Sequence, residues 1–386
     1  MFSHLLRFVN NKQIVAVGAV FLVMGILFGN WATLIPIIKS KFALDDAQLG
    51  LIILCLPVGG AVANPISTWF IHKYGVQAMT LFGLVFMCLA YLLPVAAPHA
   101  WSVGLGLFFT GSAMAFTNVS MNTCATIIEH QMRQPIMSTC HGLFSLGLMI
   151  GSLLASTLIG LKTLPLLQSG IISIFMLGIW LLIRKRILSI EDHYVEDTET
   201  IKPRFRFPKG PLLLMIGIAL CTNLTEGSMA DWTAVYLRDV VNSKEYFIGW
   251  GLASYSFCMA MGRFFGDYVI PIYGPGNILR YGGILSALGI ALAVFFPLTW
   301  VCILAFGMVG LGVSCGAPIM YGAASRLPNL AKGVGLATLN TFSVTSFLGG
   351  PVIIGFISSA LNLQIALFLI CITGLVWAYL STKINF

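Results

Sequence analysis

The chain has 386 residues, of which 58% are hydrophobic and only 9% are charged, and its mean hydropathy is +0.93. Soluble domains carry about 25% charged residues, so this composition excludes an ordinary soluble protein and indicates a chain that crosses a lipid bilayer many times. The net charge of +8 does not indicate nucleic acid binding, because the basic residues stand between apolar runs rather than on one surface.

Twelve apolar runs are long enough to cross a bilayer as helices, which takes about 20 residues each. Because the first run is too long for the core of a signal peptide, we expect it to be retained as a helix. The sequence therefore predicts an all-α membrane protein with twelve transmembrane helices at residues 13–38, 47–71, 77–97, 100–128, 135–160, 165–184, 211–238, 246–270, 276–297, 299–324, 331–359 and 363–383.

The lysines and arginines between the runs are distributed unequally. If the N-terminus is cytoplasmic, 16 of the 21 basic residues lie on the cytoplasmic side, and the other five are Lys39, Lys41, Lys162, Arg238 and Lys244. Since cytoplasmic loops carry the excess of basic residues, this pattern predicts that both termini are cytoplasmic.

One long hydrophilic segment, from Arg184 to Gly210, lies between the sixth and seventh runs. It is basic at both ends and acidic in the middle, which is typical of a solvated connector, the alternative being a regulatory site. We therefore expect an N-terminal six-helix bundle at residues 1–184, a cytoplasmic linker at 185–210 and a C-terminal six-helix bundle at 211–386.

Two acidic residues, Glu226 and Asp231, lie inside a predicted crossing, where an ionised carboxylate costs at least about 2.5 kcal/mol. At about 1.5 Å per residue from Pro211, Glu226 is roughly 22 Å deep and Asp231 roughly 30 Å, near the outer surface. We expect both to take part in proton coupling, with Glu226 as the main site. The alternatives are a static hydrogen bond for Glu226 and an outer-gate or helix-end role for Asp231.

These two carboxylates are five positions apart, or about 140° around a regular helix. We therefore do not expect them to share a face or to form a dyad. Burial disfavours the charged form of a carboxylate, so such a group binds or releases a proton as water reaches it or leaves it.

Other polar and aromatic residues inside the runs are candidates for lining a substrate cavity. In the fourth run Asn118 and Asn122, with Glu129 beyond its end, follow helical spacing and form a polar stripe, unless the asparagines only bond neighbouring helices. The aromatic candidates suit stacking against a sugar or a heterocycle, whereas tryptophans near the surface also serve as interfacial anchors. The other candidates are Asn30, Trp31, His141, Trp232, Tyr255, Tyr321 and Asn340, with a packing role as the alternative for His141.

The sequence has none of the patterns that would indicate an enzyme or a cofactor. A GxxxxGK[ST] loop, a GxSxG turn and His/Cys clusters at metal spacing are all absent. The nine cysteines lie inside the apolar runs and are interpreted as packing residues. We expect no cofactor, no metal site and no enzymatic activity.

The twelve runs, their division into six and six, and the central hydrophilic segment resemble the major facilitator superfamily over essentially the whole chain. The segment His72-Lys73-Tyr74-Gly75 resembles the family's loop between crossings two and three, but only Lys73 and Gly75 match its pattern. His72 stands where the family usually has Asp. In the second half, the segment from Gly262 to Asp267, at the predicted cytoplasmic end of crossing eight, resembles the corresponding cluster. The resemblance implies an inner gate formed by Lys73, Gly75, Arg263 and Asp267.

Arg263 and Asp267 are four positions apart and share a helix face, so a structural salt bridge at the membrane surface is the alternative to the gate. The run from Glu226 to Trp232, EGSMADW, is similar to a bacterial branch near the fucose-permease-like members. The resemblance implies a monomeric transporter of the bacterial inner membrane, with crossings one, four, seven and ten around a central cavity.

Together these observations predict a proton-coupled symporter of a small neutral or polar solute, such as a sugar, that works by alternating access. Its expected partners are protons and that solute. We expect no organic anion, because no Arg or Lys stands in the middle of a predicted crossing. The first alternative is a proton-coupled antiporter that exports cationic or amphipathic compounds, and the second is a membrane-embedded enzyme or a sensor that transports nothing.

Overall fold

A computed structural model describes residues 8, 10–133, 135–190, 208, 210–327 and 334–384, with backbone only for Asp267, Leu336, Ala337 and Val344. The described part of the chain is helical and contains no strand. The first six crossings are α2 (Lys12–Lys41), α3 (Asp46–Tyr74), α4 (Val76–Ala90) continued by α5 (Leu93–Ala96), α6 (Ala100–Met132), α7 (Met137–Gly160) and α8 (Pro165–Leu188).

The second half has the same number of crossings. They are α9 (Pro211–Asp239), α10 (Trp250–Tyr273), α11 (Pro275–Phe295), α12 (Thr299–Val313) followed by α13 (Gly316–Ala324), α14 (Val334–Ala360) and α15 (Leu363–Ser381), with the short 3-10 helix η1 (Glu245–Phe247) before α10. The predicted all-α fold with twelve crossings is confirmed, and the predicted boundaries differ from the observed ones by only a few residues.

Eleven of the helical segments in the described residues are long and apolar enough to cross a membrane on their own. The crossing outside this set is α10, whose second half carries Arg263 and Asp267. Its packing against α7 on one side and α12 on the other places it inside the bundle. An unusually polar crossing therefore lies between two apolar ones.

Local sequence explains where several helices begin. Asn11 caps α2 by accepting hydrogen bonds from the backbone N–H groups of Gln13 and Ile14. Asp45 and Gln48 form a reciprocal capping box at the start of α3. The turn between α3 and α4 is a single residue, Gly75, whose φ of 84° favours glycine.

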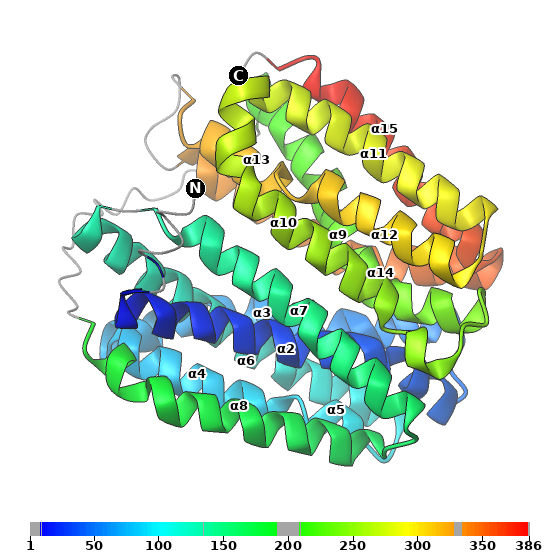
Figure 1. The fold of residues 1–386 in the computed structure, drawn as a ribbon, viewed down its shortest axis with the longest axis horizontal. Helices are drawn as coiled ribbons and strands as arrows, with labels where there is room; N and C mark the ends of the chain where they lie inside the picture. The colour runs from blue at the N-terminus through cyan, green and yellow to red at the C-terminus, as the bar shows by residue number, and fades with distance from the viewer. Residues whose placement is uncertain are drawn as a thin grey trace.

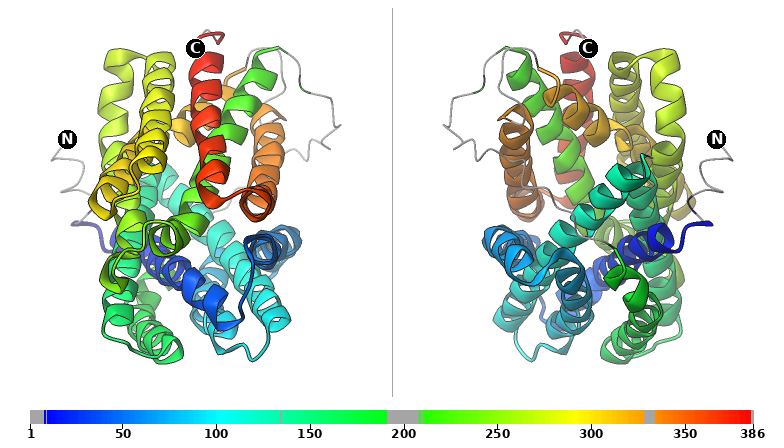
Figure 2. Two further views of the ribbon diagram at one scale, coloured as in Figure 1. Left: turned by 90° about the vertical axis from the view of Figure 1, so that its right-hand side faces the viewer. Right: turned by 90° about the vertical axis from the view of Figure 1, so that its left-hand side faces the viewer.

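The first six crossings lie together in one part of the molecule and the last six in the other (Figures 1 and 2). Between the two parts, α7 packs on α10, α3 on α14 and α2 on α9. Most of the predicted linker, residues 191–207 and 209, lies outside the described residues. The proposed bundle boundaries at 184 and 211 therefore stay a prediction.

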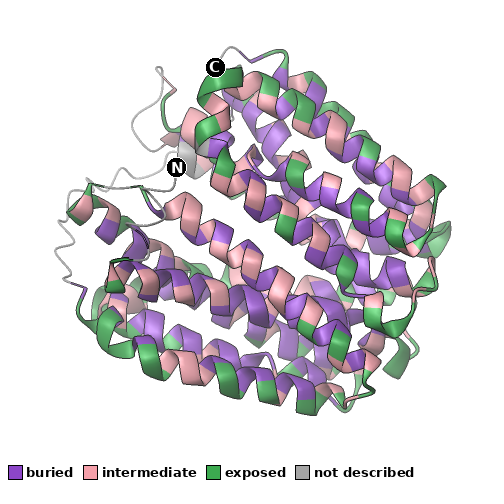
Figure 3. Cartoon of the chain, in the orientation of Figure 1, coloured by how far each residue is buried: buried purple, intermediate pink, exposed green. Residues whose placement is uncertain are grey.

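Close helix approach inside the first half depends on small residues. A Cβ atom on Gly25 or Gly29 would overlap the carbonyl oxygens of Phe144 or Leu148 on α7. Without side chains at these positions the backbones of α2 and α7 come into direct contact, which is how membrane helices pack in the absence of a hydrophobic driving force. Buried residues occupy the surfaces where helices face each other, and many exposed residues lie on the outside of the bundle (Figure 3).

We call the side that carries the loops before α3 and before α10 the outer side, following the predicted orientation. There, Lys39 of α2 contacts Asp46 of its own half at 2.6 Å and Asp239 of the other half at 2.5 Å. Arg238 of α9 donates to the backbone carbonyl of Pro36. We refer to these contacts among Lys39, Asp46, Asp239, Arg238 and Pro36 as the outer closure.

Helices α3 and α14 also contact each other near the outer side. The hydroxyl of Ser358 donates to Asp46, and Gly50 lies against the backbone of Pro351. Toward the opposite ends of the same two helices, Trp69 and Asn340 are exposed. The hydrogen bond and the close backbone contact between these two helices therefore lie toward their outer ends.

Replacing Lys39 by Met should weaken the outer closure, because Asp46 and Asp239 would lose the cation that they share. Partly exposed ion pairs contribute up to about 1 kcal/mol, so we expect the population with separated outer ends to rise by up to about fivefold. Spin labels at Ala43 and Lys244, one on each half, would show longer distances in pulsed electron paramagnetic resonance. Lys41→Met is the matched control, because Lys41 bonds the carbonyl of Ala97 within the first half; an equal response of both variants would contradict the assignment.

Candidate functional site

An ion pair lies about halfway across the second half of the molecule. Nη2 of Arg263 on α10 lies 3.3 Å from Oε1 of Glu226 on α9, and the two side chains are 9% and 25% exposed. Glu226 is about 20 Å from each end of α9 at 1.5 Å per residue. A permanent positive charge and a carboxylate thus face each other inside the helical bundle.

Arg263 also reaches the first half of the chain. Its Nη1 donates to Oγ of Ser145 at 2.8 Å and to the backbone carbonyl of His141 at 3.4 Å, both on α7. In addition, Oγ of Ser138 donates to the backbone carbonyl of Arg263 at 3.0 Å. One side chain therefore links three helices across the boundary between the halves.

Two tyrosines lie near this ion pair. Tyr255 of α10 is within electrostatic range of Glu226 and Arg263, and its buried hydroxyl has no hydrogen-bond partner among the described residues. Tyr321 of α13 is also within range of Glu226, and its hydroxyl donates to Oδ1 of the exposed Asn340 on α14 at 3.3 Å. We call Glu226, Arg263, Tyr255, Tyr321 and Asn340 the central cluster.

The position of Arg263 corrects one premise of the sequence analysis. Arg263 is about 20 Å from the start of α10 and about 15 Å from its end, so it lies inside the crossing rather than at its cytoplasmic end. The prediction that no basic residue stands in the middle of a crossing is wrong, so anionic solutes are not excluded by the lack of a counter-charge. Glu226 was the available signal, since a carboxylate at that depth needs a partner.

Asp231, the second membrane carboxylate, lies apart from this pair. It is 8% exposed, and no hydrogen bond or ion pair joins it to another described residue. It lies about 12 Å from the outer end of α9, the position that the sequence predicted, and it is buried there. The two carboxylates do not pair, as their spacing predicted.

Several predicted cavity residues make structural contacts elsewhere. Asn30 is buried and bonds Gln168 at 2.8 Å and Ser169 at 3.1 Å, both on α8. Trp31 and Trp232 are almost fully buried, so the interfacial-anchor alternative for them is wrong. Asn30 therefore joins α2 to α8 rather than to the ion pair of Glu226 and Arg263.

The polar stripe on α6 and His141 are placed as follows. Asn122 donates to Oδ1 of Asn118 at 2.6 Å, and both side chains are at least partly exposed. Glu129 instead accepts hydrogen bonds from the first backbone N–H groups of α7, those of Ile136 and Met137, and so stabilises a helix end. The ring of His141 packs edge-on against that of Phe21, with 5.3 Å between centroids, while its carbonyl accepts from Arg263.

The residues of the predicted inner gate do not form one cluster among the side chains that are described. Lys73 lies 5.0 Å from the ring centroid of Trp69 and 5.1 Å from that of Tyr74, a cation–π arrangement within α3. Gly75 forms the turn to α4, Arg263 pairs with Glu226, and the side chain of Asp267 lies outside the described part of the chain. The gate role of these four residues therefore stays a prediction.

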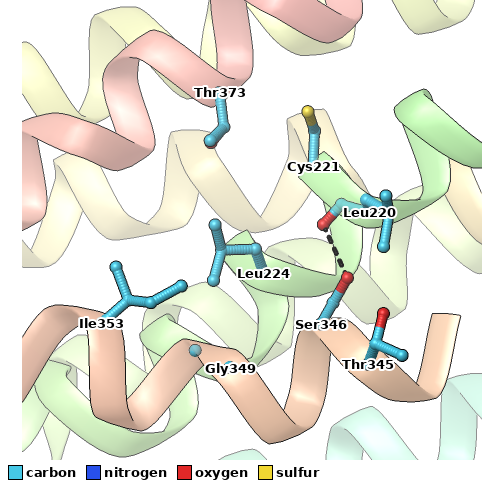
Figure 4. A pocket seen from close by; sticks show the side chains of 9 residues that line it. Leu220, Cys221, Leu224, Thr345, Ser346, Gly349, Ile353 and Thr373 are labelled. Atoms are coloured by element: carbon cyan, nitrogen blue, oxygen red, sulfur yellow. Dashed lines mark hydrogen bonds between the residues drawn. The ribbon is translucent and has the colours of Figure 1, made fainter. Parts of the chain in front are cut away.

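A cavity of about 240 Å³ lies between α9, α14 and α15 (Figure 4). The hydroxyl of Ser346 donates to the carbonyl of Leu220 at its edge, at 3.2 Å. Leu224, another lining residue, is about 200° around α9 from Glu226, so this cavity is on the opposite face from the central cluster. Its lining carries no charged residue and consists of Leu220, Cys221, Leu224, Thr345, Ser346, Gly349, Gly350, Ile353 and Thr373.

The described residues contain no group of three or more His, Cys, Asp or Glu side chains that could hold a metal ion. What the central cluster offers is hydrogen bonding: a carboxylate that accepts, a guanidinium that donates, and phenol and amide groups that do both. These groups suit a small polar ligand.

Comparison with known proteins agrees with this architecture. A family model described as Major Facilitator Superfamily matches residues 16–247. An uncharacterized MFS-type transporter of Yersinia pestis is 31% identical over 357 residues, covering 92% of this chain and 91% of that protein. The membrane protein MosC of Rhizobium meliloti is 27% identical over 371 residues, covering 95% and 89%.

Solved structures extend the similarity to three dimensions. The crystal structure of the transporter FucP in the outward conformation gives a TM-score of 0.66 at 16% identity, covering 97% of this chain and 100% of that one. The crystal structure of the nucleoside transporter NupG gives 0.73 at 11% identity, covering 96% and 98%. At these identities the likeness establishes the fold.

Replacing Glu226 by Gln should destabilise the protein, because Arg263 would keep a charge with no counter-charge in the bundle. Breaking a fully buried pair costs about 3 to 5 kcal/mol, and for this partly exposed one we expect about 1 to 3 kcal/mol. Thermal unfolding of purified protein in detergent would show the loss. The double variant Glu226→Gln with Arg263→Met should recover part of it, and the exposed Glu245→Gln is the matched control. No loss in the single variant would mean that the pair does not stabilise the fold.

Proposed function

Because the chain belongs to the major facilitator superfamily, we propose that it couples proton movement to the symport of a small neutral polar solute. The chain is a multi-pass membrane protein of a transporter family and not an enzyme. Substrate class, coupling ion and direction are the proposed parts. We further propose a monomer in the bacterial inner membrane with both termini in the cytoplasm.

The observation that supports a neutral solute is the pairing of Glu226 with Arg263. The pair has no net charge, so an ionic solute would have to break it or remain without a counter-charge. A solute rich in hydroxyl groups can accept from the guanidinium and donate to the carboxylate at the same time. The tyrosines of the central cluster add an aromatic surface and further hydroxyls.

Alternating access is supported by the position of the contacts between the halves. The outer closure joins α2 to α9 by ionic and hydrogen bonds that side-chain movement can break and re-form. Arg263 bonds α7 across the same boundary deeper in the molecule. A rocking motion of the two halves would release both sets of contacts and change which side of the central cluster meets water.

Proton coupling is supported by the two carboxylates inside α9. A carboxylate in the membrane changes protonation when water reaches it or is excluded, and this links proton binding to the motion. The antiport alternative, in which Glu226 attracts a cation, is less well supported. Arg263 already neutralises that carboxylate, so an exported cation would have to displace a guanidinium held by three helices.

A thermal-shift screen on purified protein tests the solute class. The panel contains sugars, other polyols and nucleosides, the last because one protein of similar fold is a nucleoside transporter. A ligand at 100 times its Kd stabilises the protein by about 2.7 kcal/mol through mass action. The Glu226→Gln, Arg263→Met double variant should lose this shift. A shift of equal size in that variant would mean that the solute does not use the ion pair.

Flux in proteoliposomes tests the coupling. With any solute that passes the first screen, acid outside should drive accumulation above the external concentration, and a protonophore should abolish it. An exporter would give a different result. Proteoliposomes with an acidic lumen would accumulate cationic amphiphiles in exchange for protons. Cells without the protein would become sensitive to these compounds, while their solute uptake would be unchanged. That outcome would replace symport by antiport.

A further inference from the structure

We propose that Asp231, and not Glu226, holds the coupled proton, and that binding this proton allows the outer side to close. This inference rests on the proposed function in that it assumes a proton-coupled cycle. It assigns the two membrane carboxylates different tasks. Glu226 stays ionised beside Arg263 as part of the solute site, while Asp231 changes protonation as the halves move.

Glu226 is poorly placed to take up a proton. Its carboxylate faces a guanidinium that is charged at every physiological pH. If Glu226 became neutral, Arg263, which is only 9% exposed, would keep a buried charge without a partner. The hydrogen bonds from Arg263 to Ser145 and to the carbonyl of His141 supply no negative charge to replace it.

Asp231 has the opposite surroundings. It is 8% exposed, and no described residue donates a hydrogen bond to it or forms an ion pair with it. A charged carboxylate buried in this way would keep the desolvation cost of the ion without compensation. In the observed conformation the neutral acid, with a proton bound, is therefore the form that the structure accommodates.

The other titratable groups nearby do not change this conclusion. None of them forms a hydrogen bond or an ion pair with the Asp231 carboxyl among the described residues, and α14, which also packs on α9, carries no titratable residue. The groups on α9 itself and on the other helices packed against it are Cys221, Glu226, Tyr236, Arg238 and Asp239 of α9, Lys12, Lys39 and Lys41 of α2, Tyr255, Cys258, Arg263, Asp267, Tyr268 and Tyr273 of α10, Cys302 of α12, Tyr321 of α13, and Cys371 and Tyr379 of α15.

The position of Asp231 on α9 connects it to the outer closure. Arg238 follows Asp231 by seven residues, which is about two turns, so the two lie on nearly the same face of α9 with about 10 Å between them along the axis. That face contacts the first half, because Arg238 bonds the carbonyl of Pro36 on α2. Asp231 therefore lies beneath the contact that must open to let outer water enter.

The closing step can be written with its proton balance. While α2 and α9 are apart at the outer side, Asp231 is hydrated and ionised. One proton from the outer water then binds a carboxylate oxygen, and the neutral acid can be buried as Arg238 meets Pro36 and Lys39 meets Asp239. Closure without the proton would bury an unpaired charge, so the step takes up one proton each time.

Infrared spectroscopy of the purified protein tests the protonation directly, because a protonated carboxyl has a carbonyl stretch that a carboxylate lacks. At neutral pH we expect this band in the wild-type protein and in Glu226→Gln, and its loss in Asp231→Asn. Glu245→Gln is the matched control, since the Glu245 side chain is exposed and is not part of the outer closure, and it should keep the band. Loss of the band in Glu226→Gln with retention in Asp231→Asn would overturn the assignment.

Pulsed distance measurements between labels at Ala43 and Lys244 test the link to closure. Since the closed state binds the proton more tightly, raising the pH should favour the open state, by up to about tenfold in the open-to-closed ratio per pH unit for one proton. Asp231→Asn should stay closed and lose this response, whereas the Glu226→Gln, Arg263→Met double variant should keep it. An unchanged pH response in Asp231→Asn would refute the link. Neither measurement needs a transported solute, so failure to find proton-driven flux would refute the proposed function and leave these results standing.

Discussion

The charge of Arg263 inside the helical bundle is the constraint that organises this protein. A guanidinium cannot lose its proton in a membrane protein, so it needs both a counter-charge and hydrogen-bond acceptors close by. Glu226 supplies the first at 3.3 Å, and Ser145 and the carbonyl of His141 supply the second. Because these partners belong to α9 and α7, satisfying one side chain determines how α10 sits between the two halves of the chain.

Two separate sets of bonds join the halves of the chain, one in the interior and one at the outer side. Helices α2 and α9 meet through Lys39, Asp239, Arg238 and Pro36 at the outer side, and α7 and α10 meet through Arg263 in the interior. Both sets cross the boundary between the halves, so a motion that breaks one also stresses the other. Such a linkage is what a transporter needs if closure on one side is to affect the solute site.

Glu226 and Asp231 show how the surroundings separate two similar groups on one helix. They are five residues apart and so face different neighbours: Glu226 meets a cation, and Asp231 meets no described partner. The proposed division of tasks between them rests on this difference in surroundings. In the proposed cycle, one helix thereby presents an ion pair for binding and a separate carboxyl group for proton exchange.

The sequence by itself determined the twelve crossings and their approximate ends, because each crossing must be a run of about 20 apolar residues and breaks such as Gly75 are visible directly. It also identified Glu226 and Asp231, since a carboxylate in an apolar run stands out. Only the tertiary structure decided that Arg263 lies inside the bundle opposite Glu226, that Asn30 bonds Gln168 on α8, and that Trp232 is buried. The physical reason is that depth and partner choice depend on how far each helix extends and which face it turns toward its neighbours, and hydrophobic periodicity in nearly uniformly apolar helices does not encode that rotation.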